Sequence, residues 1–209
     1  MSFNLSHDDF ENTCWEYYLQ LENRFLNITK YIMIDRSNYK TYSFEIMNLI
    51  LCICVEIESV IKIITGNRNF RIFELRESLL KKLNSILEEK VLIIGNHDIY
   101  LEPFKDFDKL TKKTIQNSNQ RWWYSYDSIK HNRMKNIKNA NFENLINSLS
   151  ALFILNSHYL ILKSDKSKKD SPRECSRIFK CTKNTFRYSN SLSAEYVDGH
   201  YLNLNFNNK

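Results

Sequence analysis

The chain contains 209 residues, carries a formal net charge of +6 at pH 7 and is 43% hydrophobic. This length and composition suffice for one buried core and exclude an intrinsically disordered chain. Only three glycines and two prolines occur, a shortage that argues against a β-sandwich or a glycine-rich nucleotide-binding fold and favours long helices. The charge is compatible with a polyanionic partner, but an excess of this size also occurs in proteins that bind no nucleic acid.

Neither the cysteines nor the first residues of the chain indicate export. The number of cysteines, five, is odd, and Cys52 and Cys54 lie inside an apolar run, so the spacing offers no disulfide framework. Residues 1–10 are polar and acidic, unlike the cationic and then apolar start of a secretory signal peptide. We expect a cytoplasmic protein with reduced thiols.

Five stretches of the chain place apolar residues at helical spacing. The first follows the helix-starting residues Ser6, Asp8 and Asp9, and the second ends at Gly66, a residue typical of a helix C-cap. The sequence therefore predicts a mainly α fold, a helical bundle. The predicted helices cover about residues 9–35, 43–65, 70–90, 119–133 and 140–162.

The stretch from Phe44 to Thr65 is apolar enough to suggest a membrane helix. Glu45, Glu56, Glu58 and Lys62 interrupt it, whereas a spanning helix needs about 18 or more residues with few or no charges. We predict a central core helix and no membrane association.

Glu56 is the most informative residue of this predicted core helix. It lies one or two helical turns from Leu49, Ile53 and Val60, so it should point inward. A buried carboxylate needs a partner. The alternative is that Glu56 lies at the bundle surface and forms a salt bridge with Lys62.

Two motifs suggest metal binding but lack the remaining ligands. Gly95 to Asp98 has the sequence Gly-Asn-His-Asp, a signature of metal-dependent phosphoesterases, but the chain lacks the further aspartate and histidine segments that such two-metal sites need. We expect a polar turn there, preceded by an extended segment or a loop over Val91–Ile94. Cys175 and Cys181 lack a second close pair of zinc ligands. We predict no metal and no cofactor.

The last part of the chain has a different pattern. Residues 163–173 are rich in lysine and serine and include Pro172, which predicts a linker. Beyond them, short alternating segments, the last of them around Asp198-Gly199, favour strands. We therefore predict a helical bundle over residues 1–162, a linker over 163–173 and a small β-rich extension over 174–209.

Aromatic residues, cations and a histidine are densest between Arg121 and Arg133, where the sequence is RWWYSYDSIKHNR. Helical spacing turns part of this predicted helix toward the core and gathers the cations around His131 near its end. We expect a nucleic-acid interface there, formed by Arg121, Lys130, Arg133, Lys135 and Lys138. The alternative is that the cations only favour the helix dipole and that Trp122 and Trp123 are core residues.

Several segments together resemble a group of uncharacterised bacterial HEPN-like helical proteins, over about residues 10–162. The segments that carry the resemblance are Trp15–Glu22, Thr41–Ser43, Glu56–Glu58, Pro103-Phe104, Trp122–Arg133 and Ala140-Asn141. HEPN domains are helical bundles in which an Arg-x(4–6)-His motif, helped by an acidic or polar residue of an earlier helix, commonly cleaves RNA without a metal. Many are toxins or antiviral effectors, frequently dimers that bring two motifs together.

The resemblance implies a role for individual residues. His131 matches the motif histidine, and Glu56 or Glu58 matches the earlier polar residue. Tyr126 stands where the motif arginine is expected, so the cation would come from Lys130, Arg133 or the more distant Arg121. The expected catalytic residues are His131, Lys130, Arg133 and Glu56, and the expected supporting residues are Tyr126, Asp127 and Glu58.

The function that the resemblance implies is that of an RNA-directed effector, a metal-independent endoribonuclease of a toxin or phage-defence system. In such cleavage the RNA 2′-hydroxyl attacks the adjacent phosphorus, a histidine moves a proton and a cation stabilises the phosphoryl oxygens. The expected partners are RNA, a second copy of the chain and an antitoxin or other defence-system protein. The alternative function is a non-catalytic HEPN-like module that binds nucleic acid or protein.

Overall fold

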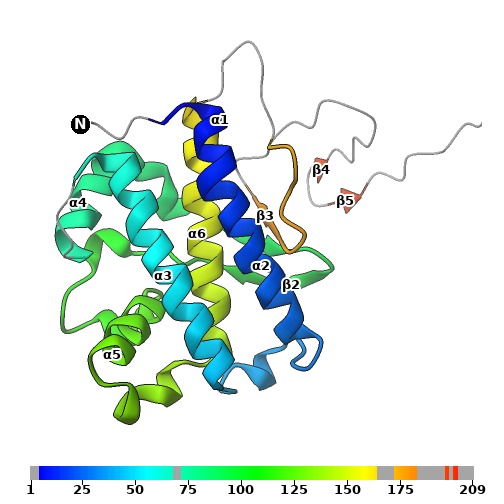
Figure 1. The fold of residues 1–209 in the computed structure, drawn as a ribbon, viewed down its shortest axis with the longest axis vertical. Coiled ribbons are helices and arrows are strands. Elements are labelled where there is room, and N and C mark those ends of the chain that lie inside the picture. The colour runs from blue at the N-terminus through cyan, green and yellow to red at the C-terminus, as the bar shows by residue number, and fades with distance from the viewer. Residues whose placement is uncertain (1–4, 68–71, 164–171, 183–195, 198–199, 202–209) are drawn as a thin grey trace, which may run out of the picture.

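The computed structural model describes residues 5–67, 72–163, 172–182, 196–197 and 200–201. Helices dominate this part of the chain and surround one hydrophobic core, with a small antiparallel sheet at one side (Figure 1). The main helices are α1 (His7–Phe10), α2 (Glu16–Thr29), α3 (Phe44–Thr65), α4 (Ile72–Lys82), α5 (Arg121–Asn136) and α6 (Phe142–Lys163). The strands are β1 (Val91–Ile93), β2 (Asn96–Leu101), β3 (Phe179–Cys181), β4 (Tyr196–Val197) and β5 (His200–Tyr201). The mainly α prediction is confirmed at this level.

The first helical stretch runs from α1 through the π-helical turn η1 (Glu11–Trp15) into α2. Ser6 begins it as predicted, because its hydroxyl oxygen accepts the backbone N–H of Asp9 at 3.1 Å. The stretch ends at Thr29, a few residues before the predicted end, and a polar connection leads on to α3.

The helix α3 begins and ends where the sequence predicts. The Ser43 hydroxyl accepts the backbone N–H of Ile46 at 3.1 Å, and Gly66 ends the helix with a φ of +69°. A side chain at N-cap and a glycine in the left-handed region are the usual local signals for these two ends. α3 packs along α6, and the two helices cross the centre of the fold side by side (Figure 1).

The helix α6 is buried along almost its whole length, from Phe142 to Leu160. By length and mean hydropathy, which is 1.5 over its most apolar window, it could cross a membrane, but 83% of that window is buried inside the fold. α6 is therefore the core helix of this structure, and α2, α3 and α5 all pack against it.

The predicted helix over residues 70–90 is shorter than expected. α4 ends at Lys82, Leu83 leaves the helical region with φ −134° and ψ 57°, and a 3-10 helix, η3 (Asn84–Glu88), follows. The break lets both Leu83 and Ile86 enter the core. The local apolar pattern contains both residues and did not reveal the change of direction between them.

The three-stranded sheet combines the Val91–Ile94 region, where an extended segment or a loop was expected, with a strand of the predicted β-rich extension. Its order is β2-β1-β3, with antiparallel pairing throughout, so two of its three strands come from the middle of the chain. β1 and β2 form a hairpin whose turn contains Gly95 with a φ of +82°. Only the start of the predicted polar turn is a turn, since Asn96 to Asp98 already belong to β2. The side chains of these three residues lie outside the described part.

Residues 172–182, here called the strap, pack into the same core as the helices. Ile178, Phe179 and Cys181 are all buried members of that core. The strap thus shares the core of the helices, and the division into a bundle, a linker over 163–173 and an extension over 174–209 stays a prediction. The first part of the predicted linker, residues 164–171, and most of the predicted extension after residue 182 lie outside the described residues.

Buried carboxylates fasten the strap to one face of η1 and α2. Glu11 accepts the backbone N–H of Arg173, and Glu22 accepts the backbone N–H of Arg177 at 3.0 Å. Between them, the indole N–H of Trp15 donates to a strap carbonyl oxygen at 2.8 Å. The spacing of these residues puts them on one side of a helix, and Figure 1 shows the strap running beside α2.

The third buried carboxylate, Glu89, lies between η3 and β1 and also reaches the strap. Its oxygen is 3.4 Å from Nε2 of His158 on α6. Burial, followed by the charge of Glu89 and its hydrogen bond, raises the pKa of the Cys181 thiol well above its usual range. Glu11, Glu22 and Glu89 are the buried carboxylates of the described residues, and each contacts the strap.

Candidate functional site

The apolar face of α5 anchors the helix that carries the predicted site. Trp122, Trp123, Tyr126 and Ile129 are all buried, at helical spacing, and α5 packs against α3 and α6. The indole N–H of Trp122 donates to the Pro103 carbonyl oxygen at 3.3 Å. The two tryptophans are therefore core residues, which was one of the two expectations from the sequence. They fix the helix so that its other face is presented to solvent.

The second half of α5 contains a kink at Asn132, which has φ −151° and ψ 77°. The side-chain amide of Asn136 bridges it, donating to the carbonyl oxygens of Ser128 at 3.0 Å and of Asn132 at 2.9 Å. Around this kink the exposed residues are mostly cationic. We call five of these exposed residues the cationic end of α5: Lys130, His131, Arg133 and Lys135 in α5, and Lys138 in the 3-10 helix η6 (Ile137–Asn139) that follows.

His131 is open to solvent, with 72% of its side chain exposed. Its Nδ1 lies 2.8 Å from the backbone carbonyl oxygen of Asp127 and 3.5 Å from that residue's carboxylate. A carbonyl oxygen can only accept a hydrogen bond, so in the neutral imidazole Nδ1 carries the hydrogen and Nε2 has a free lone pair. His131 is thus oriented to accept a proton on Nε2.

Lys130 is connected to Glu58 through a tyrosine hydroxyl. Its Nζ donates to the Tyr126 hydroxyl at 3.3 Å and lies 5.2 Å from the centre of that ring. The pKa of Tyr126 is raised above its usual range by burial first, and then by the charge of Glu58 and a hydrogen bond to it. The Tyr126 hydroxyl thus joins Glu58 of the core helix to the cationic end of α5.

Glu56 lies on a different side of α3 from Glu58. Burial raises the pKa of Glu56, and a hydrogen bond from the Cys14 thiol lowers it in part. Its partner is therefore in η1, whereas the glutamate that bonds to the Tyr126 hydroxyl of α5 is Glu58. Two residues along a helix are about 200° apart around its axis, so one helix cannot aim both glutamates at α5. The structure does not bring Glu56 into the site with His131.

Arg121 also lies apart from the cationic end. It is the first residue of α5, ten residues before His131, which is about 15 Å along the axis at 1.5 Å per residue. There Arg121 lines a polar cavity of about 370 Å³ together with Glu143 of α6. The predicted interface therefore consists of two places, one at each end of α5.

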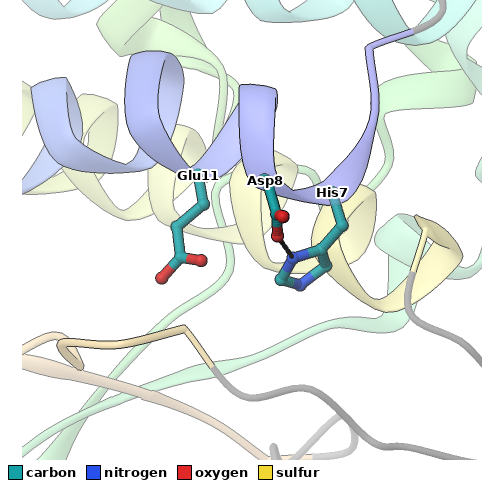
Figure 2. A group of neighbouring side chains, drawn as sticks. All are labelled: His7, Asp8 and Glu11. Carbon is teal, nitrogen blue, oxygen red and sulfur yellow. Dashed lines mark ion pairs between the residues drawn. The ribbon is translucent and has the colours of Figure 1, made fainter.

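A cluster that the sequence analysis missed lies at the start of α1. His7, Asp8 and Glu11 place one possible metal-ligand atom each within 4.8 Å of one another, and Nδ1 of His7 is 3.6 Å from the Asp8 carboxylate (Figure 2). Histidine and glutamate four residues apart on a helix are the signal that could have revealed it. The Glu11 carboxylate, however, already accepts the backbone N–H of Arg173 and lies 3.8 Å from its guanidinium. These contacts with the strap explain the burial of the Glu11 carboxylate without a need for a metal ion.

Comparisons with known proteins add no relative to this geometry. No family model matches the chain, and no match is found among the curated proteins or the solved structures.

Proposed function

We propose that the protein is an RNA-directed effector of the HEPN-like type, a metal-independent endoribonuclease in which His131 moves the proton. The observation that carries the proposal is the His131 imidazole, exposed among cations, with Nδ1 held by the Asp127 carbonyl and Nε2 free. This arrangement sets the tautomer that a general base needs. Asp127 is one of the residues expected to support the site, and in the proposed reaction its carbonyl oxygen holds Nδ1 of His131.

In the proposed reaction, residues of the cationic end bind the RNA, move a proton and stabilise charge. Lys130 and Arg133 bind the RNA phosphate, and Nε2 of His131 takes the proton of the 2′-hydroxyl as its oxygen attacks the adjacent phosphorus. The bond from phosphorus to the 5′ oxygen breaks, leaving a 2′,3′-cyclic phosphate and a 5′-hydroxyl. Lys130, oriented by Tyr126 and Glu58, stabilises the charge on the phosphoryl oxygens.

The leaving 5′ oxygen needs a proton, and His131 of the same chain has already acted as the base. A second copy of the chain would supply it from a protonated His131, in agreement with the dimers common among HEPN domains. The exposure of His131 on the surface rather than inside a closed cleft supports such a shared site. Mixing inactive His131→Ala chains with active chains at increasing ratios tests it, because a shared site predicts that activity falls faster than the active fraction.

The second candidate function is a module that binds RNA without cleaving it. The observation that favours it is the position of Glu56, whose partner is Cys14 rather than His131. Without that carboxylate the site has one proton-transfer residue per chain. The cationic end would then serve binding alone, with affinity set by phosphate contacts and lowered by salt.

The deciding experiment incubates the purified protein with mixed RNA and excess chelator and analyses the fragment ends. We expect 2′,3′-cyclic phosphate termini, and a loss of about 10²- to 10⁴-fold in rate for His131→Ala, with RNA affinity and melting temperature retained. Met134→Ala is the matched control, since Met134 is 85% exposed in the same segment and carries no group for the reaction. Cleavage that persists in His131→Ala would overturn the assignment, and binding without cleavage would favour the module.

A toxin or antiviral role follows from the proposed activity and needs a separate test. Induced expression of the wild-type chain in bacteria should arrest growth, and expression of His131→Ala should not. Growth arrest by both variants would separate toxicity from the proposed chemistry.

A further inference from the structure

The polar cavity at the other end of α5 lies between three segments of the fold. They are the turn η5 (Ile115–Asn117) with the residues after it, the first residues of α5, and the first turns of α6. Its volume of about 370 Å³ is at the lower end of the range for small-ligand sites. Its lining is mostly polar, with Trp122 closing one side.

Two opposite charges line this cavity and do not neutralise each other. Arg121 comes from α5 and Glu143 from the first turn of α6, and neither side chain forms an ion pair within the described ranges. Glu143 is only partly exposed. A ligand entering the cavity therefore meets a planar cationic donor and a carboxylate acceptor that are both available.

Two asparagines add acceptors that are held in place. Asn144, which is 2% exposed, donates its side-chain N–H to the Asn139 carbonyl oxygen at 2.8 Å. Asn147 donates in the same way to the Glu143 carbonyl oxygen at 2.8 Å. Because the nitrogen of each amide is used by a backbone carbonyl, the amide oxygens of Asn144 and Asn147 are left to accept hydrogen bonds from a ligand.

The cavity thus offers acceptors from α6 and one bidentate donor from α5, and guanine has the complementary pattern. Its N1–H and N2–H₂ groups donate on one edge, and its O6 and N7 atoms accept on the other, where arginine is the usual partner. Adenine would present the N1 lone pair to Glu143, and the pyrimidines lack the adjacent acceptor pair that O6 and N7 of guanine offer to Arg121. Single-stranded RNA bases are commonly read in this way, turned out of the strand into a pocket.

We propose that this cavity binds a guanine base of an RNA strand, with Glu143, Asn144 and Asn147 accepting from the base and Arg121 donating to it. That the guanine belongs to an RNA rests on the proposed function, whereas recognition of the base does not. The strand would run along α5, with its guanine at Arg121 and the reacting phosphate about 15 Å further along the helix, at His131. The cavity would then select which phosphates are cut.

The test measures binding of the four ribonucleoside 5′-monophosphates to the full chain by titration calorimetry, without RNA. We expect GMP to bind about 5- to 150-fold more tightly than AMP, CMP or UMP, the range for one good bidentate contact. Glu143→Gln should remove most of this preference, and Arg121→Gln should weaken GMP binding. Lys30→Gln, an exposed cation at the end of α2, is the charge-matched control and should change neither.

The outcomes separate this proposal from the proposed function. Equal binding of the four nucleotides, or a GMP preference that survives Glu143→Gln in a variant with an unchanged melting curve, would overturn the guanine site. RNA cleavage with no base preference would refute the selection of the cut phosphate by this cavity, while leaving His131 in its role. A GMP preference that depends on Glu143, in a chain that cleaves no RNA, would keep the guanine site and refute the nuclease.

Discussion

The strap and the cationic end of α5 are both rich in charge, but their charged groups have opposite environments. Glu11 and Glu22 are 3% and 0% exposed, and each has several donors around its carboxylate. Lys130, His131 and Arg133 are exposed, and the ammonium group of Lys130 and the guanidinium of Arg133 form no ion pair within the described residues. The first cluster orders the chain itself, whereas the second leaves its charges available to a partner.

The difference follows from the cost of burying charge. A carboxylate withdrawn from water is tolerated only when hydrogen bonds and opposite charges replace its solvation. The oxygen atoms of such a buried carboxylate are already used by donors of the protein and do not bind a ligand. An exposed cation stays solvated in the free protein. When a nucleic acid binds, the cation contacts a phosphate and counterions are released. Substitutions of buried carboxylates and their partners should therefore lower stability most, and substitutions at the exposed cationic end should lower it least.

The largest effect should come from Glu22→Ala. The change leaves the donors of Tyr18, Ser176 and Arg177 without their acceptor, and breaking a buried charged pair typically costs about 3–5 kcal/mol. Denaturant unfolding measures the change. The matched control is Glu45→Ala, which breaks an exposed 2.8 Å ion pair with Arg24 and should cost about 1 kcal/mol or less. Equal losses in the two variants would show that the strap contributes little to stability.

A smaller effect is expected for Tyr18→Phe. The Tyr18 hydroxyl donates to the Glu22 carboxylate at 2.8 Å, and one hydrogen bond to a charged group contributes about 1.5–3 kcal/mol. The free energy of unfolding should fall by this amount, with the aromatic packing unchanged. Tyr17→Phe, on the 37% exposed neighbour, serves as the control and should have little effect. A neutral result for Tyr18→Phe would mean that Glu22 is satisfied by the strap alone.

A pH-dependent effect is expected for Glu56→Gln. Burial raises the pKa of Glu56 above the usual 4.5, so the stability that Glu56 contributes is fully present below its unfolded pKa and is lost as the pH rises through the folded value. Glu56→Gln should therefore match the wild type near pH 4 and become relatively more stable toward neutral pH. The gain should stay below about 1 kcal/mol because solvent screens this half-buried group. Unfolding free energies measured across this pH range would contradict the prediction if the difference between the two proteins stayed constant.

The smallest effect on stability should come from the cationic end. Lys130→Gln and Arg133→Gln change exposed groups, and such changes usually stay within about 0.5 kcal/mol. Their effect should appear in RNA binding, where each lost phosphate contact lowers the slope of log affinity against log salt by about 0.7. Filter binding over a salt series measures the slope, with Lys30→Gln as the control. An unchanged slope would place the RNA elsewhere on the molecule.

Much of the helical framework was predictable because its signals are local. Ser43 and Gly66 cap α3 through bonds to their own neighbourhood, and the apolar face of α5 follows from the spacing of Trp122, Tyr126 and Ile129. The gathering of cations around His131 near the end of this helix was also predicted from that spacing. These features depend on residues within a few helical turns of one another, so they can be predicted from the sequence without knowledge of tertiary contacts.

What the sequence could not supply were the contacts between distant segments. Glu11 and Glu22 meet strap residues about 150–160 positions away, and nothing in a polar segment after a predicted linker indicates such a partner. Glu56 was correctly expected to need a partner, yet only the packing of α3 against η1 selected Cys14 over His131.

The sequence by itself determined the helices, their caps and the gathering of cations around His131, because propensity, capping and periodicity act over a few residues. Only the tertiary structure decided that the strap joins the core, that Glu58 rather than Glu56 faces α5, and that Arg121 lines a separate cavity with Glu143. The physical reason is that a charged group can be buried only where other elements supply its hydrogen-bond partners. Which elements supply them depends on how the whole chain packs.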